Sequence, residues 1–153
     1  MNEGLYVIRE NRPLTRDMFL LRLEGDTSGL TNPGQFVNIR VPEKFLRRPI
    51  SVCDWREGEL TLVYRVAGSG TAVLRDMQPG AELDLLTGLG NGYTLGKAGP
   101  APILLGGGSG IPPLLGLCRR LLALGSKPRV LLGYRTAADA YLAGDFEALG
   151  AEV

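Results

Sequence analysis

The sequence contains no histidine, and only two cysteines, Cys53 and Cys118, occur among its 153 residues. The absence of histidine excludes Ser-His-Asp and Cys-His catalytic arrangements and every metal site that uses an imidazole ligand. Two thiolates are too few to hold an iron–sulfur cluster or a cysteine-only zinc site. Both cysteines lie in apolar segments, so we expect buried free thiols, as is usual in a reducing cytoplasm.

Long apolar runs and a large net charge are also missing. The longest candidate run, 111–117, is interrupted by Pro112 and Pro113, and none approaches the roughly 18 residues of a membrane span. Charged residues occupy the N-terminal stretch where a signal peptide would be apolar, which favours a cytoplasmic location. The net charge of +1 argues against binding to nucleic acids or to anionic membranes.

Glycine is the residue in excess, with 22 copies. The glycines are not periodic, but they gather at 68–70, 88–92 and 106–110. Because glycine lets the backbone come close to a ligand, these clusters are candidate binding segments.

The first hundred residues have the pattern of antiparallel β structure. Short runs with alternating apolar residues are separated by turns about every 8–12 residues, which is typical of a sandwich or a barrel. The predicted strands are 4–9, 18–23, 35–41, 49–55, 59–66 and 82–86. Residues 69–77 have helical spacing and predict a short helix, whereas 87–99 are expected to form a loop.

The pattern changes after Pro100. A short apolar strand at 103–105 leads into the glycines of 106–110, and 112–124 continue at helical spacing to a stop at Gly125. A second buried strand is expected at 129–133, a helix at 137–149 and the start of a third strand at 151–153. This is the opening of a doubly wound α/β sheet, in fewer residues than such a domain usually has.

The segment 47–51 joins two guanidiniums, a proline-fixed extended backbone and a hydroxyl. The planar donors of Arg48 match phosphate oxygens, and Ser51 is placed to hydrogen-bond a heterocycle; a solvated basic strand end is the alternative. At 68–71 the free amides of a helix start attract anions, unless the segment is only a tight turn. Tyr64 and Arg65 offer a ring and a charge to a nucleotide, although Tyr64 also fits core packing.

The glycine-rich stretch 106–110 lies between a predicted strand and helix, where open α/β sheets bind pyrophosphate. It departs from the spacing G-x-G-x-x-G because residue 111 is Ile, and it lacks the ending of a P-loop. A turn that only lets the strand and the helix pack closely is the alternative. The stretch 89–93, LGNGY, fits a turn ending in an aromatic residue.

The order of these motifs, RRPIS, VYRVAGSGT, GLGNGY and ILLGGGSGIPPLLGL, resembles the ferredoxin-reductase-like flavoproteins over essentially the whole chain. The similarity is greatest to the electron transfer subunits of dihydroorotate dehydrogenases. It implies a mixed β and α/β fold: a six-stranded antiparallel β-barrel at 1–99 that binds FAD, followed by an incomplete doubly wound NAD-binding domain at 100–153.

The resemblance also implies roles for individual residues. The implied FAD-binding residues are Arg48, Pro49, Ile50, Ser51, Val63, Tyr64, Arg65, Gly70 and Thr71. The implied nicotinamide-nucleotide loop contains Gly106, Gly107, Gly108 and Gly110, and Gly90, Asn91 and Gly92 match a linker turn near the flavin. In this family the arginine meets the pyrophosphate and the serine approaches the flavin ring.

The chemistry implied by the resemblance is hydride transfer from NADH to FAD, followed by single-electron transfer through a two-iron cluster to a catalytic dehydrogenase subunit in pyrimidine biosynthesis. The flavin carries the reactivity, so no catalytic side chain is expected, in agreement with the missing histidine. Two other functions stay open: a docking subunit without a cofactor, and another NAD(P)H-dependent flavin or ferredoxin reductase subunit.

In the family the nucleotide domain continues for several strands, and a cysteine-rich tail binds the cluster. These 153 residues contain neither, so the cysteine ligands of the cluster are absent from them. A half sheet leaves an open edge and one uncovered apolar face, which favours self-association or a covering partner.

Overall fold

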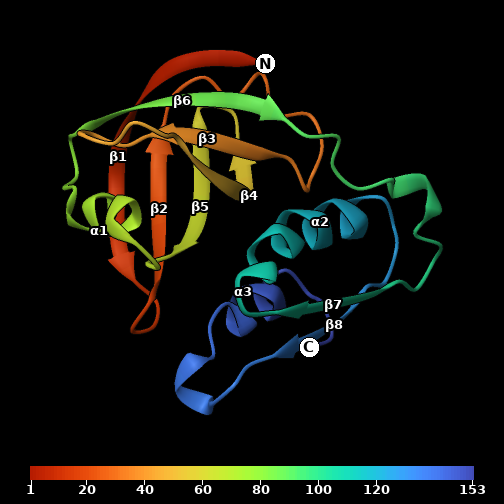
Figure 1. Ribbon diagram of the computed structural model, residues 1–153. Helices are drawn as coiled ribbons and strands as arrows, with labels where there is room; N and C mark the ends of the chain where they lie inside the picture. The colour runs from red at the N-terminus through yellow and green to blue at the C-terminus, as the bar shows by residue number, and fades with distance from the viewer.

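The computed structural model describes residues 1–153 and consists of a closed β-barrel and a smaller α/β part, which lies below the barrel in Figure 1. The barrel strands are β1 (Asn2–Pro13), β2 (Met18–Glu24), β3 (Phe36–Arg40), β4 (Arg48–Arg56), β5 (Glu59–Arg65) and β6 (Glu82–Leu89). They pair in the order β1-β2-β5-β4-β3-β6, and every pair is antiparallel. The predicted six-stranded antiparallel barrel is therefore confirmed.

The barrel interior follows from the alternation of side chains along each strand. In β5, Leu60, Leu62 and Tyr64 belong to a cluster of 15 buried residues inside the barrel. The residues between them, such as Val63, face outward and take part in other contacts.

Two barrel strands, β1 and β6, extend at least three residues beyond the ranges that their sequence patterns predict. β1 runs from Asn2 to Pro13, and β6 continues to Leu89 into the segment expected to be a loop. Asn2 pairs with Thr87, and Leu89 pairs with Phe36. Backbone pairing with a distant segment thus extends each strand beyond the point where the alternation of apolar and polar residues ends.

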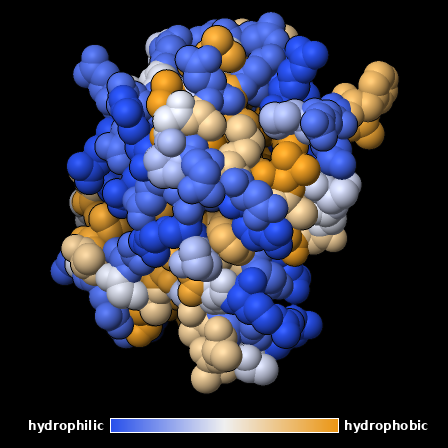
Figure 2. Space-filling model, turned by 90° about the vertical axis from the view of Figure 1, so that its left-hand side faces the viewer, coloured by the Kyte–Doolittle hydropathy of each residue, from blue (hydrophilic) through white to orange (hydrophobic).

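One helix, α1 (Ser69–Asp76), lies beside β1 and β2. Leu74 is fully buried in the barrel core, so the apolar face of α1 closes that side of the interior. Figure 2 views the molecule from this side and shows mostly hydrophilic side chains, with apolar ones in smaller patches. In α1 itself Leu74 is buried, whereas Ser69, Arg75 and Asp76 are exposed, so the helix has a buried apolar face and an accessible polar face.

The α/β part contains two parallel strands and two short α-helices. Its elements are the 3-10 turns η2 (Gly108–Gly110) and η3 (Ala137–Asp139), the strands β7 (Ile103–Gly107) and β8 (Arg129–Gly133), and the helices α2 (Pro112–Ala123) and α3 (Ala143–Ala148); a further 3-10 turn, η1 (Leu95–Lys97), lies in the connection from the barrel. β7 and β8 are parallel, and Glu152 forms a parallel bridge with Arg129. The predicted start of a third strand is thus confirmed. None of the helices is long and apolar enough to cross a membrane.

The prediction of a helix over 137–149 is wrong in its first half, because α3 begins only at Ala143. Residues 137–139 form a 3-10 turn, Ala140 is extended, and Leu142 has a left-handed backbone with φ of 65°. Tyr141 and Leu142 are buried, and the Tyr141 hydroxyl donates to the Gly108 carbonyl at 2.5 Å. These contacts outweigh local helical propensity.

The core of the α/β part is shared with the barrel. Its 14 buried residues include Met18, Leu20, Cys53 and Val63 from the outer face of the barrel, packed against residues of α2, α3, β7 and β8. Cys53 and Cys118 both lie in this core and are free thiols, as expected from the sequence. The two parts of the chain therefore meet through an apolar interface.

Candidate functional site

A first candidate site forms where the start of β4 meets the first turn of α1. Gly70 is buried, and a Cβ added there would overlap Nε, Cζ and Nη2 of Arg48. The Arg48 guanidinium also donates through Nη1 to the Leu46 carbonyl at 2.5 Å. The missing side chain of Gly70 thus makes room for a guanidinium beside the helix start.

The start of α1 supplies hydrogen-bond donors at the same place. The first bond inside this turn runs from the Ala72 amide to the Gly68 carbonyl at 2.9 Å, so the amides of 69–71 have no acceptor within the helix. The Thr71 hydroxyl accepts the amides of Ala67 at 3.0 Å and Gly68 at 3.2 Å and holds the turn. A cation and free amides beside each other form an anion-binding arrangement.

The next residues of β4 continue from this point along the barrel. Pro49 and Ser51 are exposed, whereas Ile50 is half-buried against the barrel core. The same strand thus carries Arg48 and an accessible Ser51 hydroxyl. The face of β4 that bears Pro49 and Ser51 is open to a bound molecule.

Tyr64 lies differently from its two neighbours on β5. Its ring is 2% exposed inside the barrel, and its hydroxyl donates to Asn11 Oδ1 at 3.0 Å. This burial raises the pKa of the phenol to about 12. Val63 lies in the shared core and Arg65 is exposed, so only the backbone of Tyr64, and not its ring, is near the outer face.

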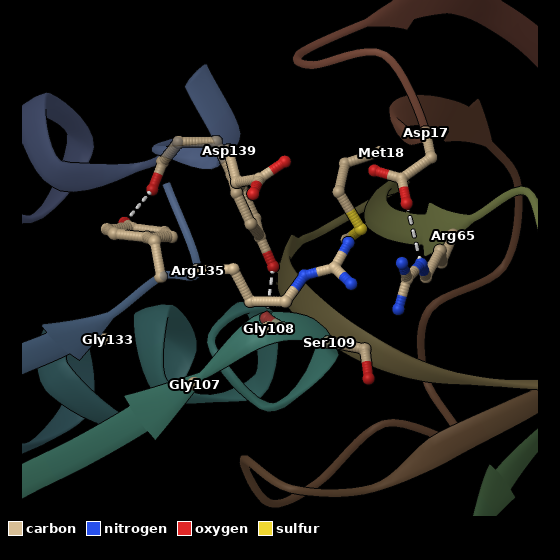
Figure 3. A pocket seen from close by; sticks show the side chains of 11 residues that line it. Asp17, Met18, Arg65, Gly107, Gly108, Ser109, Gly133, Arg135 and Asp139 are labelled. Carbon is tan, nitrogen blue, oxygen red and sulfur yellow. Dashed lines mark hydrogen bonds and ion pairs between the residues drawn. The ribbon is translucent and has the colours of Figure 1, made fainter. Parts of the chain in front are cut away.

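A second candidate site is a cavity of about 410 Å³ between the barrel and the α/β part, shown in Figure 3. Its lining residues are Asp17, Met18, Arg65, Gly107, Gly108, Ser109, Gly133, Tyr134, Arg135, Asp139 and Tyr141. The barrel supplies one wall, and the ends of β7 and β8 with the segments that follow them supply the other. Ligands of open α/β sheets bind at such carboxyl ends of strands.

Two guanidiniums extend into this cavity from opposite walls. Arg65 comes from β5, and Arg135 follows β8 (Figure 3). Arg65 donates through Nε to Asp17 at 2.7 Å. Burial acts to raise the pKa of Asp17, but the hydrogen bond and charge of Arg65 bring that pKa below its ordinary value. The cavity therefore contains the Arg65–Asp17 ion pair, a further guanidinium from Arg135, and a further carboxylate from Asp139, which accepts a hydrogen bond from the Thr136 hydroxyl. Arg135 is the group in this lining that suits a ligand carrying phosphate.

The glycines of 106–110 have different tasks. A Cβ at Gly106 would lie 2.7 Å from Leu114 Cδ1 and 3.3 Å from the Ile111 Cα, so this glycine permits close packing of β7 on α2. Gly107 and Gly108 line the cavity, and Gly108 has a left-handed φ of 52°. Gly110 is exposed and does not line it.

The predicted linker turn at 90–92 is fixed to the loop between β2 and β3. Gln35 donates to the Gly90 carbonyl at 3.2 Å, and Asn32 donates to the carbonyls of Asn91 at 3.0 Å and Tyr93 at 2.8 Å. The turn lines neither the cavity nor the Arg48 site. Its hydrogen bonds give the connection between the two parts a defined course.

Several residues of the cavity were not singled out from the sequence. They are Asp17, Met18, Gly133, Tyr134, Arg135, Asp139 and Tyr141. A usable signal existed for Arg135, because it follows a predicted parallel strand in the same way as the glycine-rich stretch does. No local signal marks Asp17, whose place depends on the packing of the α/β part against the barrel.

The closed barrel with an arginine at its capping helix, and the parallel strand–helix unit with a glycine-rich turn beside it, make up the two-part architecture of ferredoxin-reductase-like proteins. No family model matches the chain. It is 41% identical over 128 residues to a dihydroorotate dehydrogenase B electron transfer subunit from Bacillus caldolyticus, covering 79% of this chain and 50% of the relative. It is 40% identical to that subunit from Enterococcus faecalis, covering 97% and 59%.

Solved structures agree with this likeness. An NADH-dependent reduced ferredoxin-NADP oxidoreductase matches with 29% identity and a TM-score of 0.87, covering 97% of this chain and 55% of the other. Phthalate dioxygenase reductase matches at 24% identity with a TM-score of 0.76, covering 98% and 48%, and supports the fold alone. The chain is thus similar over most of its length to ferredoxin-reductase-like proteins, and the curated relatives that it matches are dihydroorotate dehydrogenase B electron transfer subunits. It spans between half and three-fifths of the length of these two relatives.

The ligands of an iron–sulfur cluster are not among these residues. The two cysteines are both buried, and no group of three or more histidine, cysteine, aspartate or glutamate side chains is placed to hold a metal ion. The side chains of these residues therefore do not fit an iron–sulfur cluster.

Proposed function

We propose that this chain is the FAD-binding part of a cytoplasmic electron-transfer subunit that accepts hydride from NADH and passes electrons to a partner dehydrogenase in pyrimidine biosynthesis. The observation that carries the proposal is the Arg48 guanidinium seated on Gly70 beside the free amides of α1. The names of the relatives support the choice of reaction and of a catalytic partner subunit.

The first candidate site fits the diphosphate of FAD. Arg48 provides charge-assisted donors, and the amides of 69–71 provide neutral ones. Ser51 and the backbone of 63–65 then lie along the barrel face for the flavin ring. When bound, FAD would supply the acceptance of a hydride and its release as single electrons. The protein's part is to bind and orient the cofactor.

The cavity between the two parts fits a nicotinamide nucleotide. Arg135 would donate to its phosphates, Arg65 would offer the guanidinium nitrogens that Asp17 does not occupy, and the glycine backbone of 107–108 allows a close approach. We assign residues 1–99 to the FAD domain and 100–153 to part of the NAD domain. Because the cavity touches both, a nucleotide in it would be held against the barrel, with water displaced from their contact.

Replacement of Arg48 by Ala tests the FAD site. We expect FAD to bind about 1.5–3 kcal/mol more weakly, because a charge-assisted hydrogen bond is lost. Quenching of flavin fluorescence during titration measures the dissociation constant. Arg9→Ala is the matched control, since Arg9 forms an exposed ion pair with Glu24 on the barrel and lies outside both sites. Equal affinities in wild type and Arg48→Ala would remove Arg48 from the site.

The reaction itself is tested by mixing the FAD-loaded protein with NADH without oxygen. Loss of the visible flavin absorbance is the expected result. A protein that stays colourless in excess FAD but captures a larger dehydrogenase would instead be a docking subunit. Weak FAD retention with NAD(P)H turnover would favour a reductase of free flavin.

We also propose that copies of the chain associate through the open face of the β7–β8 sheet. Ile103, Leu105 and Leu131 are 66%, 76% and 45% exposed on one face, whereas Leu104 and Val130 are buried on the other. Neighbouring apolar side chains on a strand pair favour burial against a like surface.

A further inference from the structure

A β-bulge in β4 brings two consecutive residues to the outer face of the barrel. Val52 pairs with Leu62, but Asp54 pairs with Thr61, so the register shifts by one residue between them. Val52 lies in the barrel core and Cys53 in the shared core, and Trp55 packs back against the barrel core. The extra residue thus leaves Asp54 facing α2 together with Cys53. Bulges commonly re-aim a side chain in this way.

α2 comes unusually close to this bulge. A Cβ added at Gly116 would lie 2.9 Å from the Cys53 carbonyl oxygen. One helical turn later, Arg119 donates to both Asp54 oxygens, through Nε at 2.9 and 3.0 Å and through Nη2 at 2.6 Å. Its Nη2 also donates to the Trp55 carbonyl at 3.0 Å. These bonds join the two parts of the chain by a bidentate, charge-assisted contact.

The position of α2 sets the position of the glycine-rich turn. η2 ends at Gly110, and α2 begins at Pro112. Gly106 is packed against Leu114 in the first turns of the helix. The position of the turn is therefore fixed by its packing on α2. The opposite wall of the cavity, with Met18 and Arg65, belongs to the barrel to which Asp54 is fixed.

We propose that Asp54 and Arg119 are positioning residues, which hold the glycine-rich turn at the distance from Arg65 that a pyridine dinucleotide requires. Neither residue lines the cavity, so their effect is exerted through α2. That the ligand is a pyridine dinucleotide rests on the proposed function. The effect of the Asp54–Arg119 contact on the distance between the barrel wall and the α/β wall of the cavity does not depend on it. Removing the contact is expected to loosen the cavity while the Arg48 site, which lies within the barrel and α1, stays intact.

The first measurement is the separation of the two parts. Spin labels on Gln78→Cys, which follows α1, and on Glu147→Cys in α3 report the distance across the junction, because both positions are exposed and the native thiols are buried. We expect one narrow distance distribution in the otherwise unaltered protein and a broader one in Arg119→Ala. An unchanged distribution in Arg119→Ala would overturn the proposal.

The second measurement is flavin reduction by NADH in FAD-loaded protein. Since misplacement of reacting groups by about 1 Å can cost about 100-fold in rate, we expect Arg119→Ala to slow reduction by about 10- to 100-fold. The FAD dissociation constant is expected to stay within about twofold, because lost contacts outside a site leave its local bonds in place. A uniform loss of FAD binding together with the slower reduction would contradict a positioning role.

Two further variants keep the test decisive. Asp54→Asn keeps the size of the side chain and removes its charge, so it serves if Arg119→Ala does not fold. The exchange Asp54→Arg with Arg119→Asp restores opposite charges and should recover the narrow distribution and part of the rate.

Arg9→Ala is the control for loss of an ion pair within the barrel. If the unaltered protein is not reduced by NADH, the proposed function fails, whereas the spin-label distances still decide the role of the pair.

Discussion

At the scale of single residues, three glycines owe their identity to three different neighbours. Gly70 faces the Arg48 guanidinium, Gly106 faces Leu114, and Gly116 faces the Cys53 carbonyl. None of the three has a left-handed backbone, so lack of volume, and not backbone freedom, is what each position requires. Their glycines therefore mark places where segments distant in sequence are pressed together.

Gly70→Ala is expected to displace Arg48 from its seat, because the added Cβ would overlap the guanidinium. The displaced side chain would lose its alignment with the amides of α1, and FAD would bind about 10-fold more weakly, the effect of about 1.4 kcal/mol. Flavin fluorescence titration checks this. Gly68→Ala is the matched control, since nothing lies within 4 Å of a Cβ there and its φ of −161° is extended. Equal weakening by both changes would contradict the steric explanation.

Part of the candidate site could be predicted at this scale. The convergence of 48–51 with 70–71 was implied by the order of motifs, and strand alternation already puts 60, 62 and 64 on one face. The same alternation indicates that the ring of Tyr64 points inward and Arg65 outward, as is found. Asp17 could not be assigned to the cavity from sequence, because only the packing of the α/β part on the barrel brings it there, whereas the position of Arg135 directly after a predicted parallel strand was a signal that could have been used.

At the scale of elements, one side chain of β1 fixes the C-terminal end of α1. Asn11 donates through Nδ2 to the carbonyls of Leu74 at 2.9 Å and Met77 at 2.9 Å. Its Oδ1 accepts the hydroxyl of Tyr64 from the barrel core. The last carbonyls of a helix lack partners inside it, so Asn11 both satisfies them and anchors the helix to the barrel.

Asn11→Ala is expected to lower stability by about 1–3 kcal/mol, because it leaves the hydroxyl of the buried Tyr64 and two carbonyls at the end of α1 without their partner. The start of α1 should then become less ordered, and FAD should bind more weakly. Denaturant unfolding and FAD titration measure the two effects. Gln78→Ala, at an exposed position just after the helix, is the control. A normal free energy of unfolding in Asn11→Ala would show that water replaces the side chain without cost.

Element boundaries were less predictable than element types. The barrel strands and α2 follow their apolar periodicity, but β1 and β6 are lengthened by mutual pairing, which no local pattern encodes. The 137–149 segment has helical periodicity throughout, yet burial of Tyr141 and its bond to Gly108 interrupt it. Long-range contacts explain each of these differences.

At the scale of the whole molecule, the sheet of the α/β part is covered on one face only. α2 packs on the side of Leu104 and Val130, and Leu105 and its neighbours are exposed on the other. An exposed strand pair with apolar side chains is prone to pair with a like surface.

Leu105→Lys is expected to shift the protein toward the monomer, because burying a charge without a partner opposes association. Light scattering coupled to size-exclusion chromatography, over a range of protein concentrations, measures the mass. Leu46→Lys is the matched control, since Leu46 is 67% exposed but lies on the barrel. A mass that is the same for wild type and Leu105→Lys at every concentration would exclude this face as the contact.

The shared core has a consequence for recombining such proteins. A crossover placed in the linker near residue 99 would divide the chain neatly but would separate Met18, Leu20, Cys53 and Val63 from the side chains they pack against. In a chimera that takes its α/β part from another reductase, the side chains on the two sides of the shared core would thus not match in shape. Grafting the outer face of β2, β4 and β5, bulge included, along with the foreign part would restore the match.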